Sequence, residues 1–144
     1  MLPTRFLQNK KTYISYNNFR KNTFSQLAPK DSEAILYLLP WLLSVNHPSF
    51  PGYVKDIVKP FKVYGVDMDK DVLKREPVFK TMFGMKKEGT LLRYPTGVNL
   101  IPGIYTIGSV GTVSQTSRSD CDIWICIDQK AFDEKATTQF NQKL

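Results

Sequence analysis

A glycine–serine turn and an acidic pair lie close together in the sequence, and each adjoins a short apolar stretch. The first stretch ends at Gly108 and Ser109, and the second begins at Asp120 and Asp122. Residues at i and i+2 of a strand point to the same face, so we expect the two carboxylates to lie side by side. Two carboxylates that close repel each other unless a cation lies between them. The pattern therefore predicts a divalent-metal site at one end of a small sheet.

The residues between the turn and the acidic pair favour a phosphate ligand. Gly108 has no side chain and lets the backbone approach a ligand closely. A short helix is expected at 110–117, which would place Ser109 at a helix N-terminus, where free N–H groups and the helix dipole favour phosphate. Arg118 is either a second phosphate-binding residue or a solvent-facing loop residue. The residues alone predict a metal-dependent enzyme acting on a nucleoside triphosphate.

Simpler interpretations exist for each part of this pattern. A lone Gly-Ser after a strand is usually only a turn, and Asp-x-Asp at a strand start is often a solvated edge. Their combination, in this order, favours a functional site. The single histidine, His47, lies in a proline-rich turn and gives no zinc site. Cys121 and Cys126 have an odd spacing, so on one strand they face opposite sides and cannot pair.

The expected fold class is α+β, with a short mixed sheet, helices packed on it and a helical region before it. We expect a division into 1–53, the helical N-terminal region, and 54–144, which carries the site. The expected elements are a helix or outer arm at 5–27, a buried helix beginning at Asp31 or Ser32 and interrupted by Pro40, a strand at 61–66, a helix at 69–83 disturbed by Pro77, strands at 104–107 and 121–127, and a helix at 129–142 capped by Asp128.

Composition indicates the kind of ligand and the cellular compartment. The apolar content of 42% supports a core, and the net charge of +7 suits an anionic ligand. The longest apolar run, 34–45, contains Pro40 and is too short to cross a bilayer. The N-terminus has no apolar signal core, and nothing suggests a disulfide framework. We therefore expect a cytoplasmic protein with no membrane span.

Two regions of the chain carry a resemblance to a known family. The first reads Gly103-Ile104-Tyr105-Thr106-Ile107-Gly108-Ser109, then Val113-Ser114-Gln115, Ser117, Ser119-Asp120 and Asp122-Ile123-Trp124-Ile125-Cys126. The second reads Leu38-Leu39-Pro40, Leu42-Leu43, His47-Pro48 and Pro51-Gly52-Tyr53. The first resembles the signature of the DNA polymerase β-like nucleotidyltransferase superfamily. Together they are similar to the N-terminal catalytic region of class I adenylate cyclases of the enterobacterial type.

The resemblance implies a partial nucleotidyltransferase core that converts ATP to cyclic AMP and pyrophosphate. The ribose 3′-hydroxyl would attack the α-phosphate of its own nucleotide, with two magnesium ions (Mg²⁺) stabilising the attacking and leaving oxygens. Asp120 and Asp122 match the metal-binding aspartates, and Gly108 and Ser109 match the turn that holds the triphosphate. No nucleic-acid partner is expected.

The chain departs from that family in one respect. The superfamily uses a third carboxylate from a later strand, and the cyclases are several times longer. Asp128 lies six residues beyond Asp122, about 20 Å along an extended strand, which is too far to join the pair. We therefore expect this chain to be weakly active or inactive alone and to need the missing remainder or another chain. Two alternatives stay open: another nucleotidyltransferase, which moves a nucleotide to an acceptor, or a non-catalytic nucleotide-binding remnant.

Overall fold

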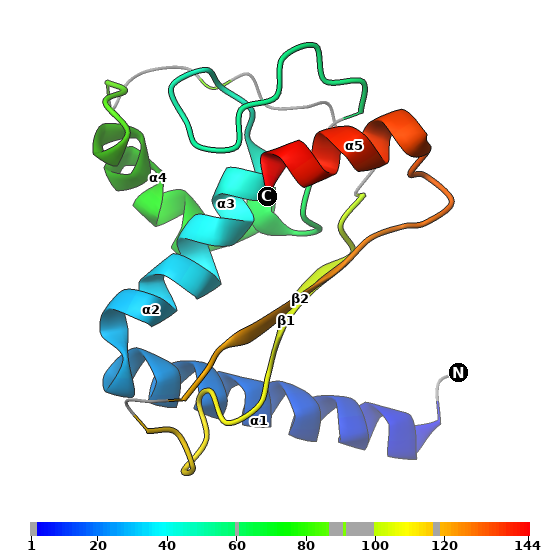
Figure 1. Ribbon diagram of the computed structural model, residues 1–144. Coiled ribbons are helices and arrows are strands. Elements are labelled where there is room, and N and C mark those ends of the chain that lie inside the picture. The colour runs from blue at the N-terminus through cyan, green and yellow to red at the C-terminus, as the bar shows by residue number, and fades with distance from the viewer. Residues whose placement is uncertain (1–2, 60, 87–90, 92–99, 117–118) are drawn as a thin grey trace. The chain divides into compact units, whose positions relative to one another are not determined.

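A computed structural model describes residues 3–59, 61–86, 91, 100–116 and 119–144 (Figure 1). In chain order it contains α1 (Thr4–Leu27), α2 (Pro29–Glu33), the π-helical turn η1 (Ala34–Leu38), α3 (Leu39–Ser44), the 3₁₀ turn η2 (Val66–Met68), α4 (Lys70–Met82), β1 (Gly103–Ile107), β2 (Asp122–Cys126) and α5 (Glu134–Lys143). Helices and a small sheet together confirm the predicted α+β class. Among the described residues, no helix combines the length and apolar character that crossing a bilayer requires.

The chain forms two compact units. The first contains Met1–Glu33 and Thr106–Ile123, and the second contains Ala34–Tyr105 and Trp124–Leu144. Each unit therefore combines segments that are far apart in the sequence. The expected division at residue 53 separated a helical region from the segment that carries the site, and it stays a prediction.

In the first unit, α1 is a helix of 24 residues in which only Phe24 is buried. The predicted helix at 5–27 is confirmed. It ends before Ala28 because the proline at position 29 disfavours helical torsions in the residue before it. The next helix begins at Pro29, so the predicted start at Asp31 or Ser32 is wrong. Proline is well suited to a first helical turn, where its missing N–H is not needed.

In the second unit, Pro40 lies in the first turn of α3, directly after the π-helical turn η1. Proline cannot donate the backbone hydrogen bond that a continuous α-helix would need at this position. The predicted interruption near Pro40 is confirmed. α3 then buries Trp41 and Leu43.

The core of the second unit consists of two apolar clusters that share α3. The first contains Trp41, Val45, Phe50, Val72, Phe79 and Leu91. The second contains Leu43, Phe61, Val63, Leu100, Ile101 and Phe140. The Trp41 ring lies 5.1 Å from the ring of Phe50 and 5.4 Å from that of Phe79. Its Nε1 donates to Oε2 of Glu76 at 3.1 Å, so the one polar atom of this buried side chain has a partner.

Residues 61–69, which lead from the second cluster into α4, are mostly irregular. The predicted strand at 61–66 is wrong, because only Val63 pairs, in a single parallel bridge to Ile101. Gly65 adopts φ 80° and turns the chain into η2. The predicted helix at 69–83 is confirmed as α4, whose N–H groups at Asp71 and Val72 donate to the Asp69 side chain. Pro77 lies inside this helix.

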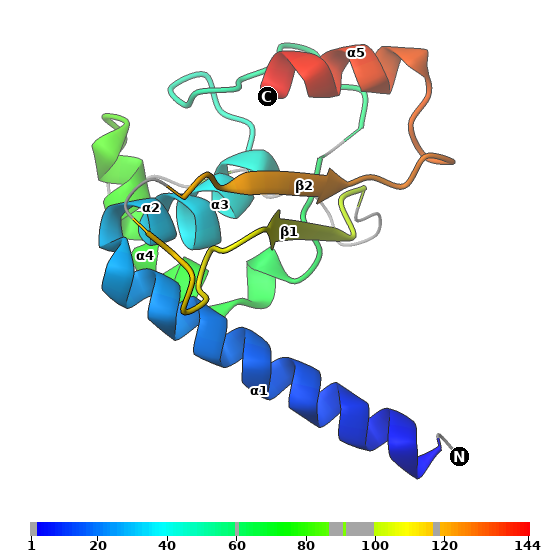
Figure 2. The same ribbon diagram turned by 60° about the horizontal axis from the view of Figure 1, so that its bottom comes forward.

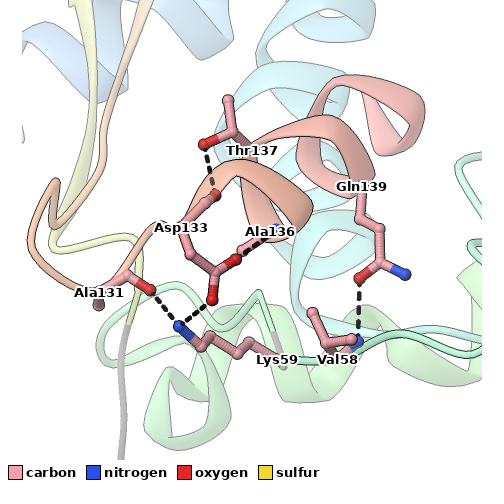
Figure 3. A network of polar contacts seen from close by, with 7 residues as sticks. All are labelled: Val58, Lys59, Ala131, Asp133, Ala136, Thr137 and Gln139. Carbon is pink, nitrogen blue, oxygen red and sulfur yellow. Dashed lines mark hydrogen bonds and ion pairs between the residues drawn. The ribbon is translucent and has the colours of Figure 1, made fainter.

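The last helix, α5, is held by polar contacts with the segment before α4 (Figure 3). Its cap is Asp133, which accepts from Ala136 N at 2.8 Å, so the predicted start at 129 and the predicted cap at Asp128 are wrong. Lys59 Nζ donates to Asp133 Oδ2 at 2.9 Å and to Ala131 O at 2.7 Å. Gln139 accepts from the Val58 N–H at 2.9 Å through its side-chain oxygen.

β1 and β2 form a two-stranded sheet. Their arrows point in opposite directions in Figure 2, so the pair is antiparallel. The predicted strands at 104–107 and 121–127 are confirmed with small changes at their ends. The predicted mixed sheet is wrong for the described residues, whose sheet is this antiparallel pair alone. The end of β1 and the start of β2 therefore lie at the same end of the sheet.

Candidate functional site

The segment that follows β1 consists of turns. The predicted helix at 110–117 is wrong over its described part, 110–116. Thr112 N donates to Ser109 O at 2.9 Å, while Thr112 Oγ1 donates to the same oxygen at 2.7 Å. Gly111 adopts φ 70°, and its N–H donates to Gln115 Oε1 at 2.7 Å. Side chains that bond the local backbone in this way compete with a helix. Ser109 is therefore not at a helix N-terminus, and the dipole argument for phosphate binding does not apply.

Ser109 nevertheless lies next to the acidic part of the motif. Its Oγ donates to Ser119 Oγ at 3.0 Å, and Ser119 Oγ also accepts from Thr116 N at 2.8 Å. Ser119 immediately precedes Asp120. The turn and the residue before the acidic pair are thus in direct contact, as the antiparallel hairpin requires.

The two predicted metal-binding aspartates are both exposed. Asp122 is the first residue of β2, and Asp120 precedes the strand. Along β2 the exposed side chains alternate with half-buried Ile123 and Ile125, so Asp122 lies on the side opposite these isoleucines. In the described ranges, no group of three or more His, Cys, Asp or Glu side chains could hold a metal ion. Arg118 lies outside the described residues.

Cys121 sits between the two aspartates. Partial burial and the carboxylates of Asp122 and Asp31 raise the pKa of its thiol. The thiolate is the form that binds metals and reacts as a nucleophile, so this environment works against both roles. Cys121 and Cys126 are both free, as predicted.

Sequence reasoning missed one residue that contacts the turn. Arg20, in the second half of α1, donates from Nε to Val110 O at 3.1 Å and from Nη2 to the same oxygen at 2.6 Å. Nη2 also donates to Gly108 O at 3.4 Å. A Cβ at Gly111 would overlap the backbone carbonyl of Arg20. No local sequence signal could pair Arg20 with a turn 88 to 90 residues later.

Comparison with known proteins identifies the family. Residues 6–144 match the family described as Adenylate cyclase NT domain. The chain belongs to this family. This confirms the resemblance noted in the sequence, and the match contains the turn, the acidic pair and Arg20.

Several curated proteins are similar to the chain. It is 35% identical over 105 residues to the adenylate cyclase of Haemophilus influenzae, which covers 69% of this chain and 12% of that protein. It is 33% identical over 94 residues to the adenylate cyclase of Pasteurella multocida, covering 64% and 11%. It is 33% identical over 96 residues to the adenylate cyclase of Escherichia coli, a match that covers 65% of this chain and 10% of that protein. The matched part of the chain thus spans about a tenth of the length of these relatives. No solved structure matches it.

Proposed function

We propose that this chain is the N-terminal, nucleotide-binding part of a class I adenylate cyclase, which converts ATP to cyclic AMP and pyrophosphate. The observation that carries the proposal is the contact between Ser109 and Ser119, which brings the two halves of the motif together. The family match over residues 6–144 and the relatives named adenylate cyclase support it.

The residues present suit magnesium. Mg²⁺ prefers oxygen ligands, keeps several waters and is usually bound through one or two carboxylates together with phosphate oxygens. Asp120 and Asp122 would hold it, since both are exposed and leave room for such a shared coordination. When bound, magnesium would stabilise charge on the phosphate oxygens. This donor set is also that of a partial nucleotidyltransferase core, which is the fold we propose for the segment around β1 and β2.

The protein's own contribution is to bind and orient the nucleotide. Gly108 adopts φ 96°, and a Cβ there would meet no atom of the described residues within 4 Å, so these residues leave the surface beside the turn open. Ser109 offers its backbone N–H at this opening, while its hydroxyl donates to Ser119. Holding the triphosphate here and the ribose 3′-hydroxyl in line with the α-phosphorus would supply much of the rate.

Activity of the chain alone is expected to be weak or absent. The described residues offer two candidate carboxylates at the motif and no third that completes a metal cluster. The matched residues span only 10 to 12% of these relatives, so the remaining ligands would come from the rest of such a protein or from another chain.

Calorimetry with ATP and magnesium tests the proposed site. We expect binding to the wild-type chain and its loss in both Asp120→Ala and Asp122→Ala. Asp128→Ala is the matched control, because this exposed carboxylate lies beyond β2 and outside the motif. Equal binding by all four proteins would refute the metal role of the pair. No binding by any of them would favour a remnant without a functional nucleotide site.

A chimaera tests the reaction. Residues 6–144 would replace the matching N-terminal segment of the Haemophilus influenzae adenylate cyclase, and the product would be incubated with labelled ATP and magnesium. Cyclic AMP that disappears in the Asp122→Ala chimaera supports the cyclase. Transfer of the label to an acceptor instead would favour the alternative nucleotidyltransferase.

A further inference from the structure

The contact between α1 and the Gly108–Val110 turn has a consequence for ligand binding. We propose that Arg20 is a positioning residue, which fixes this turn so that the Ser109 N–H faces the nucleotide's phosphates. The inference rests on the proposed function and names a residue of that same site.

The turn is fixed to α1 by two independent contacts. The carbonyls of Gly108 and Val110 both accept from the Arg20 guanidinium, and two of the three N···O distances are 2.6 and 3.1 Å. Hydrogen bonds from a charged donor are stronger than neutral ones. Gly111 lies directly on the Arg20 backbone, where any larger residue would overlap the carbonyl. Val110 between them is buried, with 3% of its surface exposed.

The direction of these hydrogen bonds determines which backbone groups of the turn point away from α1. In a planar trans peptide the C=O and the following N–H point in opposite directions. Because the Gly108 carbonyl points to Arg20, the Ser109 N–H points away from it. Within the part of the chain that the structure describes, no hydrogen bond reaches that N–H. The Gly111 N–H, two residues further on, is already bonded to Gln115.

This arrangement replaces the helix N-terminus that the sequence suggested. The turn lacks an aligned helix dipole, so its ability to accept an anion depends on how individual peptides are oriented. The positive guanidinium at the carbonyl end favours one peptide orientation, with the donor facing outward. An unpaired donor held in place needs no rearrangement when phosphate binds, which is the advantage of a preorganised site.

Arg20→Ala tests the inference in the full chain, with Lys21→Ala as the matched control. Lys21 is the next residue of α1, is exposed and carries the same charge. Amide chemical shifts would be followed by NMR while inorganic tripolyphosphate, and separately ATP, is added with magnesium. Hydrogen exchange of the Thr112 amide reports the turn, and that of the Thr137 amide in α5 reports the fold of the second unit.

In the wild type and in Lys21→Ala, we expect the Ser109 amide to shift as tripolyphosphate binds. In Arg20→Ala, we expect affinity to fall roughly tenfold and Thr112 exchange to accelerate, with Thr137 exchange unchanged. Arg20→Lys keeps the charge but cannot reproduce the planar fork, so its Thr112 exchange should stay fast. A role through charge alone would instead be rescued by this variant, which would overturn the inference.

The two proposals fail in distinguishable ways. If the wild type binds ATP and Arg20→Ala binds it equally well, the positioning role is wrong and the proposed function stands. If neither ligand shifts any amide of the wild type, both are wrong. If ATP binds while the Ser109 amide stays unaffected, the nucleotide site lies elsewhere and the inference is overturned.

Discussion

Lys143 carries a charge in a place that disfavours it, which gives a measurable pH dependence. It is the last residue of α5, and only 7% of its surface is exposed. Its Nζ donates to Val45 O at 2.7 Å and to Gly52 O at 3.2 Å. Burial lowers its pKa from 10.5 to about 8, because removing the ammonium from water is unfavourable and these two carbonyls compensate only in part.

The sign follows from the two pKa values. Between pH 8 and 10.5 the unfolded chain still holds the Lys143 proton and the folded chain has lost it. The free energy of unfolding therefore rises with pH across this window. The gain is complete above pH 10.5 and is lost as the pH falls through about 8. At roughly 1.4 kcal/mol per pH unit, the full difference is about 3 kcal/mol.

Urea unfolding, followed by tryptophan fluorescence from pH 7 to 10.5, measures this effect. The wild type should gain up to about 3 kcal/mol relative to Lys143→Met, which has a similar shape and no titrating group. Other groups titrate in the same range, so the difference between the two proteins is the quantity of interest. Lys135→Met, an exposed residue of the same helix, should keep the wild-type slope. Parallel profiles for wild type and Lys143→Met would refute the reasoning.

Three further predictions concern other parts of the chain. Gly111→Ala should release the turn from α1 and accelerate exchange of the turn amides, whereas Gly84→Ala, also at positive φ but in open space, should leave these amides unchanged. Asp133→Ala should lower the melting temperature, because Asp133 caps α5 and pairs with Lys59, two contacts that hold its native pKa below the ordinary carboxyl value of 3.8. The difference from wild type should begin to shrink as the pH falls below 3.8 and be lost as the pH falls through the lower native pKa. Cys126 should react with a thiol reagent before Cys121, whose pKa is raised, as mass spectrometry of labelled peptides would show.

Local sequence patterns predicted the elements whose causes are local. α4 begins where Asp69 can cap it, and β2 shows the alternation expected of a half-buried strand. The segment 61–66 has a similar apolar pattern, yet it forms one bridge, because a strand also needs a partner along its length. The sequence predicted the α5 cap at Asp128, whereas the cap at Asp133 begins a helix that buries Ala136, Phe140 and Lys143.

The turn after β1 shows why the site was harder to predict than the strands. Sequence spacing predicted that the Gly-Ser turn and the acidic pair adjoin, since a hairpin brings them together. It predicted a helix after the turn because the composition allows one. Whether that helix forms depends on Gly111, which lies at positive φ against α1, and on Thr112 and Gln115, which bond the local backbone. The decisive contact is tertiary and has no local signature.

Because the conformation of the turn depends on α1, the candidate site extends beyond the hairpin. A two-stranded hairpin is at best marginally stable in water, so β1 and β2 alone would hold the acidic end of the motif only loosely. The contacts with Arg20 fix the turn at the other end of the connecting loop and determine which way its peptides face. α1, which the sequence predicted as a helix or outer arm, therefore belongs to the candidate site. A fragment that begins after α1 would retain Asp120, Asp122 and the Gly-Ser turn and still lose the peptide orientation on which the proposed phosphate binding depends.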